Sequence, residues 1–351
     1  MGNTGDEAVL ASFLQGLDEL LPEAEVVVLS GDPGATERVY RVHAVPRMRL
    51  DSIARAIRGS DLLVSGGGSL LQDVTGWRSV PYYTGIMGMA GAMGVPVSVY
   101  AQGLGPLRSG LSRLLVRAAL KRASVISLRD AESMALLQSI GVAGPGAHLV
   151  ADPAFALTPL DSNHARRIAQ YQDAVVFALR PWDVGRDVTQ EYADCARKVR
   201  AELGADVVFA AFQPSSDWPM VQRIASLCSA TAVNLDMHPR EALGVIAKAQ
   251  LVVGMRLHAL IFAASVGVPA VAIEYDPKVR ALCERVGTTH VLPAGVDGGT
   301  LYETIARAWS VRERLKAEQA LAVDELRAGA RRATRLALEP ILGKESVVCA
   351  R

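Results

Sequence analysis

The stretch VVGMRLHA (252–259) holds an arginine and a histidine two residues apart. An apolar run ends at Val253, Gly254 permits a sharp turn, and Arg256 and His258 then begin a segment with an apolar helical pattern. The dipole of a helix opposes cations at its N-terminus, so these two side chains need an anion nearby. A histidine that titrates near neutral pH can also transfer a proton. A buried histidine with only a structural role is the alternative for His258.

Two more cations follow apolar runs, Arg129 in SLRDAES and Lys278 in EYDPKV. Lysine occupies only 6 of the 37 basic positions, which favours a specific role for the compact ammonium of Lys278. With Arg256, these side chains could bind phosphate and carboxylate groups through charge-assisted hydrogen bonds. Each could instead be a solvated surface residue. Asp130 is predicted to be the N-cap of the next helix.

Glycine-rich turns mark a second set of candidates. Gly66, Gly67 and Gly68 follow an apolar run in SGGGSLLQD, and Gln102 follows another in YAQGLGP. Backbone N–H groups at glycine can closely approach an anion or a sugar, particularly where a helix begins. We therefore expect a helix directly after the glycine turn and expect the turn and Gln102 to line a substrate site. A tight turn with no ligand is the alternative.

The chain opens on a similar turn, GNTGDEA (2–8), followed by an amphipathic helical pattern. Asp6 would lie in the first turn of that helix, where it could contact substrate or cap the helix. In α/β proteins a buried strand normally precedes such a turn. We therefore expect that a first N-terminal strand is missing because the start of the sequence is truncated or misassigned.

Composition and motifs argue against several function classes. The formal net charge of +1 gives no support for a nucleic-acid partner. No HExxH or P-loop motif is present, so we expect no metal site. The uncharged segment 79–107 is interrupted by glycines, which favours a buried helix and strand over a membrane span. The cysteines are far apart and form no CxxC pair, which favours a reducing, cytoplasmic location: Cys195, Cys228, Cys283 and Cys349.

Short apolar runs alternate with helical patterns and must position these residues. The runs lie within 24–30, 61–73, 95–105, 123–130, 147–155, 174–181, 205–214, 230–236, 250–256, 269–276 and 289–293. This alternation predicts an α/β fold with two Rossmann-like, doubly wound domains of mostly parallel strands. We expect an N-terminal domain over 1–157, a linker over 158–172, a C-terminal domain over 173–322 and a helical tail over 323–351. Ligands of such sheets bind beyond the carboxyl ends of the strands, and we expect the domains to face a cleft.

Seven segments, in chain order, resemble the polysaccharide pyruvyl transferase family: GNTGDEA, LLVSGGGSLLQD, YAQGLGP, SLRDAES, ADPAF, GMRLHALIFAASVGVP and EYDPKV. The sequence is most similar to the bacterial members that modify secondary cell-wall polymers for S-layer anchoring. MRLHA with the downstream YDPK is the most specific part of the resemblance. The chain departs from the family at its start, where the family has a strand ahead of the GNTGDEA loop.

The resemblance implies a GT-B-like fold and transfer of pyruvate from phosphoenolpyruvate to two hydroxyls of one sugar. The product is a cyclic ketal, phosphate is released, and the scheme requires no metal or other cofactor. The implied acceptor is N-acetylmannosamine in a lipid-linked polysaccharide precursor, which a cytoplasmic protein near the inner face of the membrane could reach. The resemblance also implies roles for individual residues: Arg129, Arg256 and Lys278 as donor ligands, His258 as the proton-transfer group, and, on the acceptor side, Asp6, Gly66, Gly67, Gly68 and Gln102.

Two other functions fit the same residues. A GT-B nucleotide-sugar glycosyltransferase would share the fold, and Arg256 and Lys278 could bind its diphosphate. A non-catalytic saccharide-binding protein would bind its ligand without releasing phosphate. The second is disfavoured, because a decayed enzyme has no reason to keep all four donor-side residues.

Overall fold

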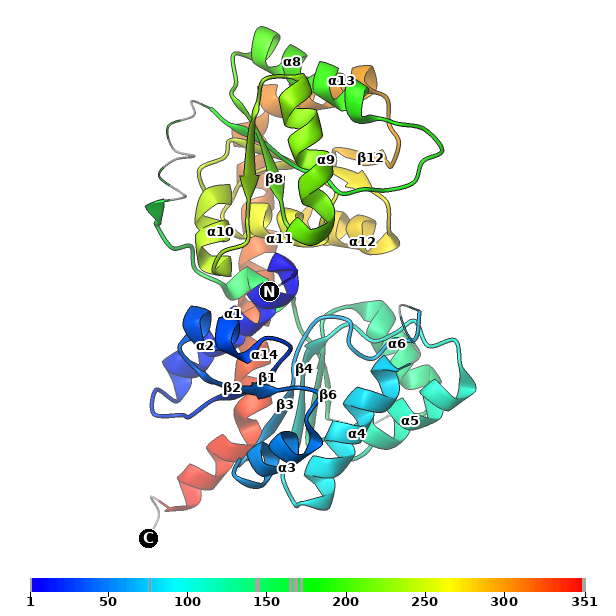
Figure 1. Cartoon of the computed structure of the whole chain (residues 1–351), viewed down its shortest axis with the longest axis vertical. Helices are drawn as coiled ribbons and strands as arrows, with labels where there is room; N and C mark the ends of the chain where they lie inside the picture. Colours follow the sequence, from blue (N-terminus) through cyan, green and yellow to red (C-terminus); the bar gives the residue numbers. More distant parts are fainter. Residues whose placement is uncertain are drawn as a thin grey trace. The chain divides into compact units, whose positions relative to one another are not determined.

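The computed structural model describes residues 2–74, 76, 78–142, 146–163, 166, 170 and 173–348. Two compact units make up the chain, and Figure 1 shows their helices and strands. Unit 1 comprises Met1–Ala8 and Leu157–Glu325, and unit 2 comprises Val9–Ala156 and Leu326–Arg351. The sequence assigns residues 1–8 to the N-terminal domain, whereas they belong here to the unit that holds the C-terminal half. Part of the predicted linker 158–172 and Cys349 lie outside the described residues.

Unit 1 is built on a six-stranded parallel sheet in the order β12-β11-β10-β7-β8-β9. Its strands are β7 (Val175–Ala178), β8 (Val207–Ala211), β9 (Thr231–Asn234), β10 (Leu251–Gly254), β11 (Ala270–Glu274) and β12 (Val291–Pro293). Read from β9, this is the doubly wound order 3-2-1-4-5-6. The order reverses between β7 and β10, so the ligand crevice of such a sheet lies at the carboxyl ends of these two strands.

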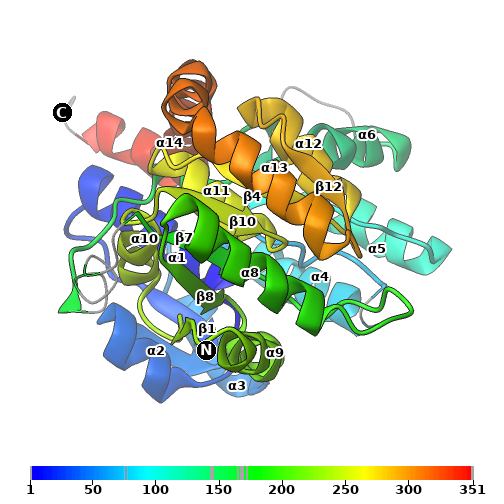
Figure 2. The same ribbon diagram turned by 90° about the horizontal axis from the view of Figure 1, so that it is seen from above.

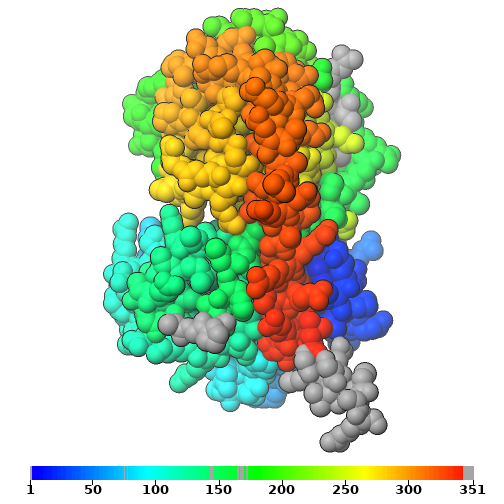
Figure 3. Space-filling view, turned by 180° about the vertical axis from the view of Figure 1, so that it is seen from behind, coloured from blue at the N-terminus to red at the C-terminus, as the bar shows by residue number. Residues whose placement is uncertain are grey.

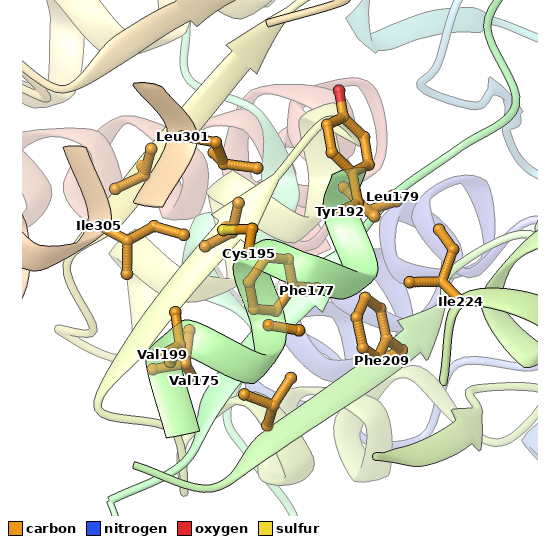
Figure 4. Packing of buried hydrophobic residues seen from close by; sticks show 14 of the residues in the cluster. Val175, Phe177, Leu179, Tyr192, Cys195, Val199, Phe209, Ile224, Leu301 and Ile305 are labelled. Carbon is orange, nitrogen blue, oxygen red and sulfur yellow. The ribbon is translucent and has the colours of Figure 1, made fainter. Parts of the chain in front are cut away.

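Helices cover both faces of this sheet (Figure 2). One face carries α8 (Thr189–Leu203), α9 (Pro214–Leu227) and α13 (Gly298–Ser310). The other carries α10 (Pro239–Ile246), α11 (Leu257–Ser265) and α12 (Pro277–Val286). Alternate strand residues point into the first layer, where Phe177 and Phe209 stack with ring centroids 5.0 Å apart (Figure 4). In Figure 3, the orange atoms of α13 form part of the surface of this unit.

Unit 2 contains two parallel sheets, one of four strands in the order β3-β4-β5-β6 and one of the pair β1-β2. The strands are β1 (Val27–Ser30), β2 (His43–Pro46), β3 (Leu63–Ser65), β4 (Val97–Gln102), β5 (Val125–Leu128) and β6 (Ala147–Leu149). The helices are α1 (Thr4–Leu20), α2 (Pro33–Tyr40), α3 (Leu50–Arg58), α4 (Ser79–Ala92), α5 (Gly110–Leu120), α6 (Ala131–Ser139) and α14 (Arg312–Val348), with a 3-10 turn at Pro153–Ala156. The element series repeats that of unit 1, except that no counterpart of β7 precedes α1 among the described residues.

Two apolar layers cover the four-stranded sheet of unit 2. One contains side chains of α3 to α6, such as Ile53, Met87 and Leu137. The other contains Val9 of α1 and Leu336 of α14. Because α1 and α14 both continue into unit 1, this second layer is built from two of the three segments that connect the units.

The predicted α/β fold with doubly wound, Rossmann-like units is confirmed, and every apolar run named above contains a strand. The sequence patterns do not predict the short strand β2, whose four residues HAVP include only two aliphatic side chains. No helix follows the glycine turn directly, so that prediction is wrong. The chain there pairs with the loop after β4, where the Asp73 carboxylate accepts hydrogen bonds from the N–H groups of Arg108 and Ser109. Among the described helices, none is long and apolar enough to cross a membrane.

Candidate functional site

Arg256 directly follows the turn after β10 and is the N-cap residue of α11. Its Nε donates to Asp217 Oδ2 at 3.0 Å and its Nη2 donates to Ser216 Oγ at 2.8 Å. Nη1 donates to Gln213 Oε1 at 2.9 Å, so the side chain reaches over β7 to the first turn of α9. Asp217 is fully buried and pairs with the guanidinium. The anion that the sequence requires beside Arg256 is therefore supplied by the protein itself.

Asp217 was not predicted, although its sequence context contains a signal. Gln213 follows an apolar run, Pro214 occupies the first helical position of α9, and Asp217 falls in the first turn. What the sequence does not reveal is the pairing of this turn with Arg256, 39 residues further along the chain. That pairing depends on the strand order β10-β7-β8.

His258 is the second residue of α11 and is half-buried in unit 1. The start of the chain packs against it: a methyl group on Gly5 would overlap the imidazole ring. Thr4 fixes this segment, because its N–H donates to the carbonyl of Phe212 at 3.0 Å and its hydroxyl to that of Leu235 at 3.2 Å. Since these carbonyls follow β8 and β9, residues 2–8 lie at the same carboxyl edge of the sheet as His258.

Asp6 lies in the first turn of α1 and is exposed. Asn3 is the residue that caps this helix, because its Oδ1 accepts the N–H of Gly5 at 3.1 Å. The Asn3 amide also donates to Asp6 Oδ2 at 3.0 Å. Asp6 thus supports the cap, and the structure places it in unit 1 with His258.

Lys278 is half-buried at the start of α12, after the carboxyl end of β11. Its backbone N–H donates to Asp276 Oδ1 at 2.9 Å. This hydrogen bond fixes the turn that carries the Lys278 side chain. Glu274, at the end of β11, pairs with Arg280. Arg256, His258 and Lys278 are therefore all at the carboxyl ends of the adjacent strands β10 and β11.

Arg129 lies in unit 2, directly after β5, and is 8% exposed. Its Nη1 donates to Asp152 Oδ2 at 2.7 Å, and its Nη2 to Ser69 Oγ at 3.3 Å. A Cβ atom at Gly103 would lie 3.1 Å from the guanidinium nitrogens Nε and Nη2 of Arg129, so the absence of a side chain at Gly103 leaves room for the guanidinium. Asp130 caps α6 by accepting the N–H of Ser133, which confirms its predicted role.

The three glycines of the turn after β3 differ in their surroundings. A Cβ on Gly67 would meet Val9 and the backbone of β4, and Gly68 has a φ of 90°. The Gly68 carbonyl accepts the N–H of Gly103 at 2.8 Å, which extends the pairing of β3 and β4. Gly66 has no atom within 4 Å of the Cβ position. Packing thus explains the glycine at position 67 and backbone conformation the glycine at position 68, whereas Gly66 faces open space.

Gln102 ends β4 and is fully buried. Neither polar atom of its amide has a hydrogen-bond partner among the described residues. The strand is irregular here, with a φ of 42° at Ala101 and a register shift against β5. Ser127 stabilises the irregularity by accepting the N–H of Ala101 at 2.8 Å and donating to the carbonyl of Val99 at 3.0 Å. Burial of an amide without a hydrogen-bond partner is costly and unusual in a folded protein.

A cavity of about 560 Å³ opens in unit 1 beside the carboxyl ends of β7 and β10. Its lining includes Arg180, Trp182, Tyr192, Arg223 and Met255. Arg180 follows an apolar run, but the sequence alone gives it no role. Its guanidinium carbon lies 4.5 Å from the ring centroid of Tyr275 and 5.4 Å from that of Trp182.

The described cysteines are unsuited to nucleophilic chemistry. Cys195, Cys228 and Cys283 are buried free thiols. Burial raises the pKa of Cys195 to about 12, and burial with the nearby Glu274 raises that of Cys283 to about 12. Among the residues that the structure describes, no group of three or more His, Cys, Asp or Glu side chains is placed to hold a metal ion.

Comparison with solved structures finds the same fold in sugar-nucleotide enzymes. UDP-GlcNAc 2-epimerase from Neisseria meningitidis, bound to UDP-GlcNAc, has a TM-score of 0.65 at 12% identity, covering 97% of this chain and 98% of that chain. HepE from Anabaena, in complex with UDP-glucose, has a TM-score of 0.57 at 12% identity, covering 97% and 96%. UDP-GlcNAc 2-epimerase from Methanocaldococcus jannaschii has a TM-score of 0.55 at 11% identity, covering 88% and 91%. At these identities the likeness shows the GT-B-like fold alone.

Comparison with curated protein sequences gave no significant match. Comparison with protein families did: residues 3–277 match the polysaccharide pyruvyl transferase family. The matched segment contains Arg129, Arg256 and His258 and ends one residue before Lys278. The chain therefore belongs to the polysaccharide pyruvyl transferase family.

Proposed function

We propose that this transferase moves pyruvate from phosphoenolpyruvate to two hydroxyls of one sugar in a cell-wall polysaccharide, forming a cyclic ketal and releasing phosphate. The observation that carries the proposal is the grouping of Arg256, His258 and Lys278 at the carboxyl ends of β10 and β11 in unit 1. Ligands of doubly wound sheets bind at this edge. The donor carries a phosphate and a carboxylate, which suit a guanidinium and an ammonium.

The proposed chemistry needs two proton transfers. One acceptor hydroxyl adds to the central carbon of the enol while a proton is delivered to the methylene carbon, which becomes a methyl group. The second hydroxyl then attacks the same carbon and gives up its proton, the carbon–oxygen bond to phosphate breaks, and inorganic phosphate leaves with that proton. His258 is the proposed proton-transfer group, because imidazole can donate or accept near neutral pH. Arg129, Arg256 and Lys278 are the proposed ligands of the donor anions, which stabilise the departing phosphate.

For the acceptor side we propose the turn at Gly66, Gly67 and Gly68 together with Gln102 and Asp6. Gln102 is the best supported of these, because burial of an amide with no protein partner is costly unless a bound molecule pairs with it. Gly66 has the open space that a sugar would need beside the backbone. The proposed acceptor is N-acetylmannosamine in a lipid-linked precursor of an S-layer-anchoring polymer, reached from the cytoplasmic face of the membrane.

The test compares phosphate release by His258→Ala and Lys278→Ala with that of the wild type, in the presence of donor and acceptor. We expect at least about a 100-fold loss for His258→Ala, the typical contribution of a general acid or base. His290→Ala and Lys248→Ala are matched controls, because they change the same residue types at the amino ends of β12 and β10. Wild-type turnover by both site variants, with unchanged thermal midpoints, would refute the assignment.

The same protein should be screened by thermal shift against phosphoenolpyruvate and against UDP-sugars. A ligand that binds the folded state raises the midpoint in proportion to its affinity and concentration. Stabilisation by phosphoenolpyruvate but not by UDP-sugars supports the proposal, and the reverse result favours a glycosyltransferase. Stabilisation by a saccharide with no phosphate release would indicate a binding protein.

A further inference from the structure

The arginines proposed to bind the donor are already paired with buried carboxylates. Arg256 is held by Asp217, and Arg129 by Asp152 at 2.7 Å. Each pair is neutral in sum, so these guanidiniums supply hydrogen bonds to a bound anion but little net charge. A donor with a phosphate and a carboxylate needs a cation whose charge the protein has not balanced. In the proposed function Lys278 is one cation for this donor, and a second can be sought among the other residues at the carboxyl edge of the sheet.

Arg180 has the right position in unit 1. Ala178 of β7 pairs with Gly254 of β10, so Arg180 and Arg256 each stand two residues beyond the same register position. Arg256 reaches over β7 towards α9, and Arg180 reaches in the opposite direction, past β10 to Tyr275 after β11. The two guanidiniums therefore both lie at the switch point of the sheet, where ligands of this fold bind.

Arg180 also has the right charge. Two other arginines line the same cavity, and both are paired: Arg186 with Glu191 and Arg223 with Asp187. No carboxylate pairs with Arg180 among the described residues, and its buried Nε has no hydrogen-bond partner there. Arg180 is thus the cation in this cavity whose charge remains unbalanced by the described side chains.

Aromatic contacts orient the guanidinium for an oxyanion. Tyr275 and Trp182 lie against Arg180, and their own ring centroids are 4.9 Å apart. Stacking on an aromatic ring occupies the face of the guanidinium and leaves its in-plane N–H groups available for a two-point contact. The N-terminus of α8 also lines the cavity, but its Thr189 N–H is already bonded to the Asp187 carboxylate at 2.9 Å, so the oxyanion is assigned to Arg180 and not to this helix end.

We propose that Arg180 anchors an oxyanion of the donor at the carboxyl end of β7, on the edge of the sheet that also holds Arg256 and next to the cavity that Arg180 lines. The identification of the donor as phosphoenolpyruvate rests on the proposed function, whereas the anion site rests on the geometry of unit 1. The cavity, at about 560 Å³, is within the usual range for small-molecule sites.

The experiment measures binding of phosphoenolpyruvate, inorganic phosphate and pyruvate to the full-length protein by titration calorimetry. We expect Arg180→Met to weaken phosphoenolpyruvate binding by about 10- to 100-fold, the loss typical of a charge-assisted two-point contact. Arg180→Lys should recover part of the loss, because it restores the charge without the planar fork. Loss of phosphate binding assigns the phosphoryl group to Arg180, and loss of pyruvate binding assigns the carboxylate.

Arg197→Met is the matched control, because Arg197 lies on the exposed surface of α8, outside the cavity, and pairs with Asp194. It should bind all three anions as the wild type does. Wild-type affinity in Arg180→Met would overturn the inference, as would a wild-type protein that binds none of the anions. If the wild type binds phosphoenolpyruvate through Arg180 but releases no phosphate with any acceptor, the anion site stands and the proposed function fails.

Discussion

At the scale of single residues, the site is organised by buried ion pairs. Asp217 is fully buried and fixes Arg256 through both carboxylate oxygens. Removing one partner of such a pair leaves an uncompensated charge in the interior, which costs far more than the loss of a surface pair. The pair therefore holds the guanidinium in one orientation at the edge of the sheet.

Asp217→Asn should lower the free energy of unfolding by about 3 kcal/mol, as expected for a buried pair that loses one charge. The exposed pair of Asp194 and Arg197 provides the comparison, and Asp194→Asn should cost less than about 1 kcal/mol. Urea unfolding followed by circular dichroism measures both. Equal and small effects would mean that Asp217 does not support Arg256.

Gly5→Ala tests the packing of the chain start on His258. A methyl group at this position would overlap the imidazole, so the ring or the first turn of α1 must move. We expect phosphate release to fall by at least about 10-fold, since small displacements of a catalytic group are costly. Gly2→Ala is the control, because no atom lies within 4 Å of its Cβ position. Equal activity of the two variants would contradict the described packing.

At the scale of elements, local sequence patterns correctly predict strands and helix caps, but they do not predict a conformation that depends on contacts distant in the sequence. The apolar runs identified all six strands of unit 1, and the position of Asp130 identified the cap of α6. The sequence predicts a helix after the glycine turn because a glycine turn often precedes a helix. The conformation of this segment is decided instead by Asp73, which pairs with N–H groups 35 and 36 residues away. A contact of that kind leaves no periodic pattern in the sequence.

The cap of α10 gives a pH-dependent prediction. His238 Nδ1 accepts the N–H of Arg240 at 3.2 Å, which requires a neutral imidazole. Burial, assisted by Arg240 and opposed by Glu241, holds the pKa of His238 below its usual 6.5. His238 therefore binds a proton more readily in the unfolded chain than in the folded protein. The contribution of this cap to the free energy of unfolding is present above pH 6.5 and is lost as the pH falls through the lower pKa of the folded state.

His238→Asn keeps a capping acceptor but does not titrate. Between pH 7.5 and about pH 5, we expect the variant to lose less stability than the wild type, by up to about 1 kcal/mol, the typical value of an N-cap. Urea midpoints at the two pH values measure the difference. Parallel acid dependence in the two proteins would show that this cap does not contribute.

At the scale of the whole chain, the two doubly wound units can be predicted from the sequence, but which segments of the chain belong to each unit cannot. Alternating strands and helices indicate two Rossmann-like halves, whereas residues 2–8 join the C-terminal half through Thr4 and Gly5. The unbalanced charge of Arg180 also emerges only when its neighbours are known. Both features depend on which segments meet in space, which one sequence does not encode in its spacing.

This member of the family is proposed to form a pyruvate ketal from phosphoenolpyruvate. The most direct measurement incubates the full-length protein with phosphoenolpyruvate and a panel of acceptor sugars, N-acetylmannosamine-containing precursors among them, and follows phosphate and acceptor mass together. We predict acceptor-dependent phosphate release with one acceptor molecule gaining the mass of pyruvic acid less one water for each phosphate formed. Phosphate release without that mass gain, or mass gain from a nucleotide sugar instead, would contradict the claim.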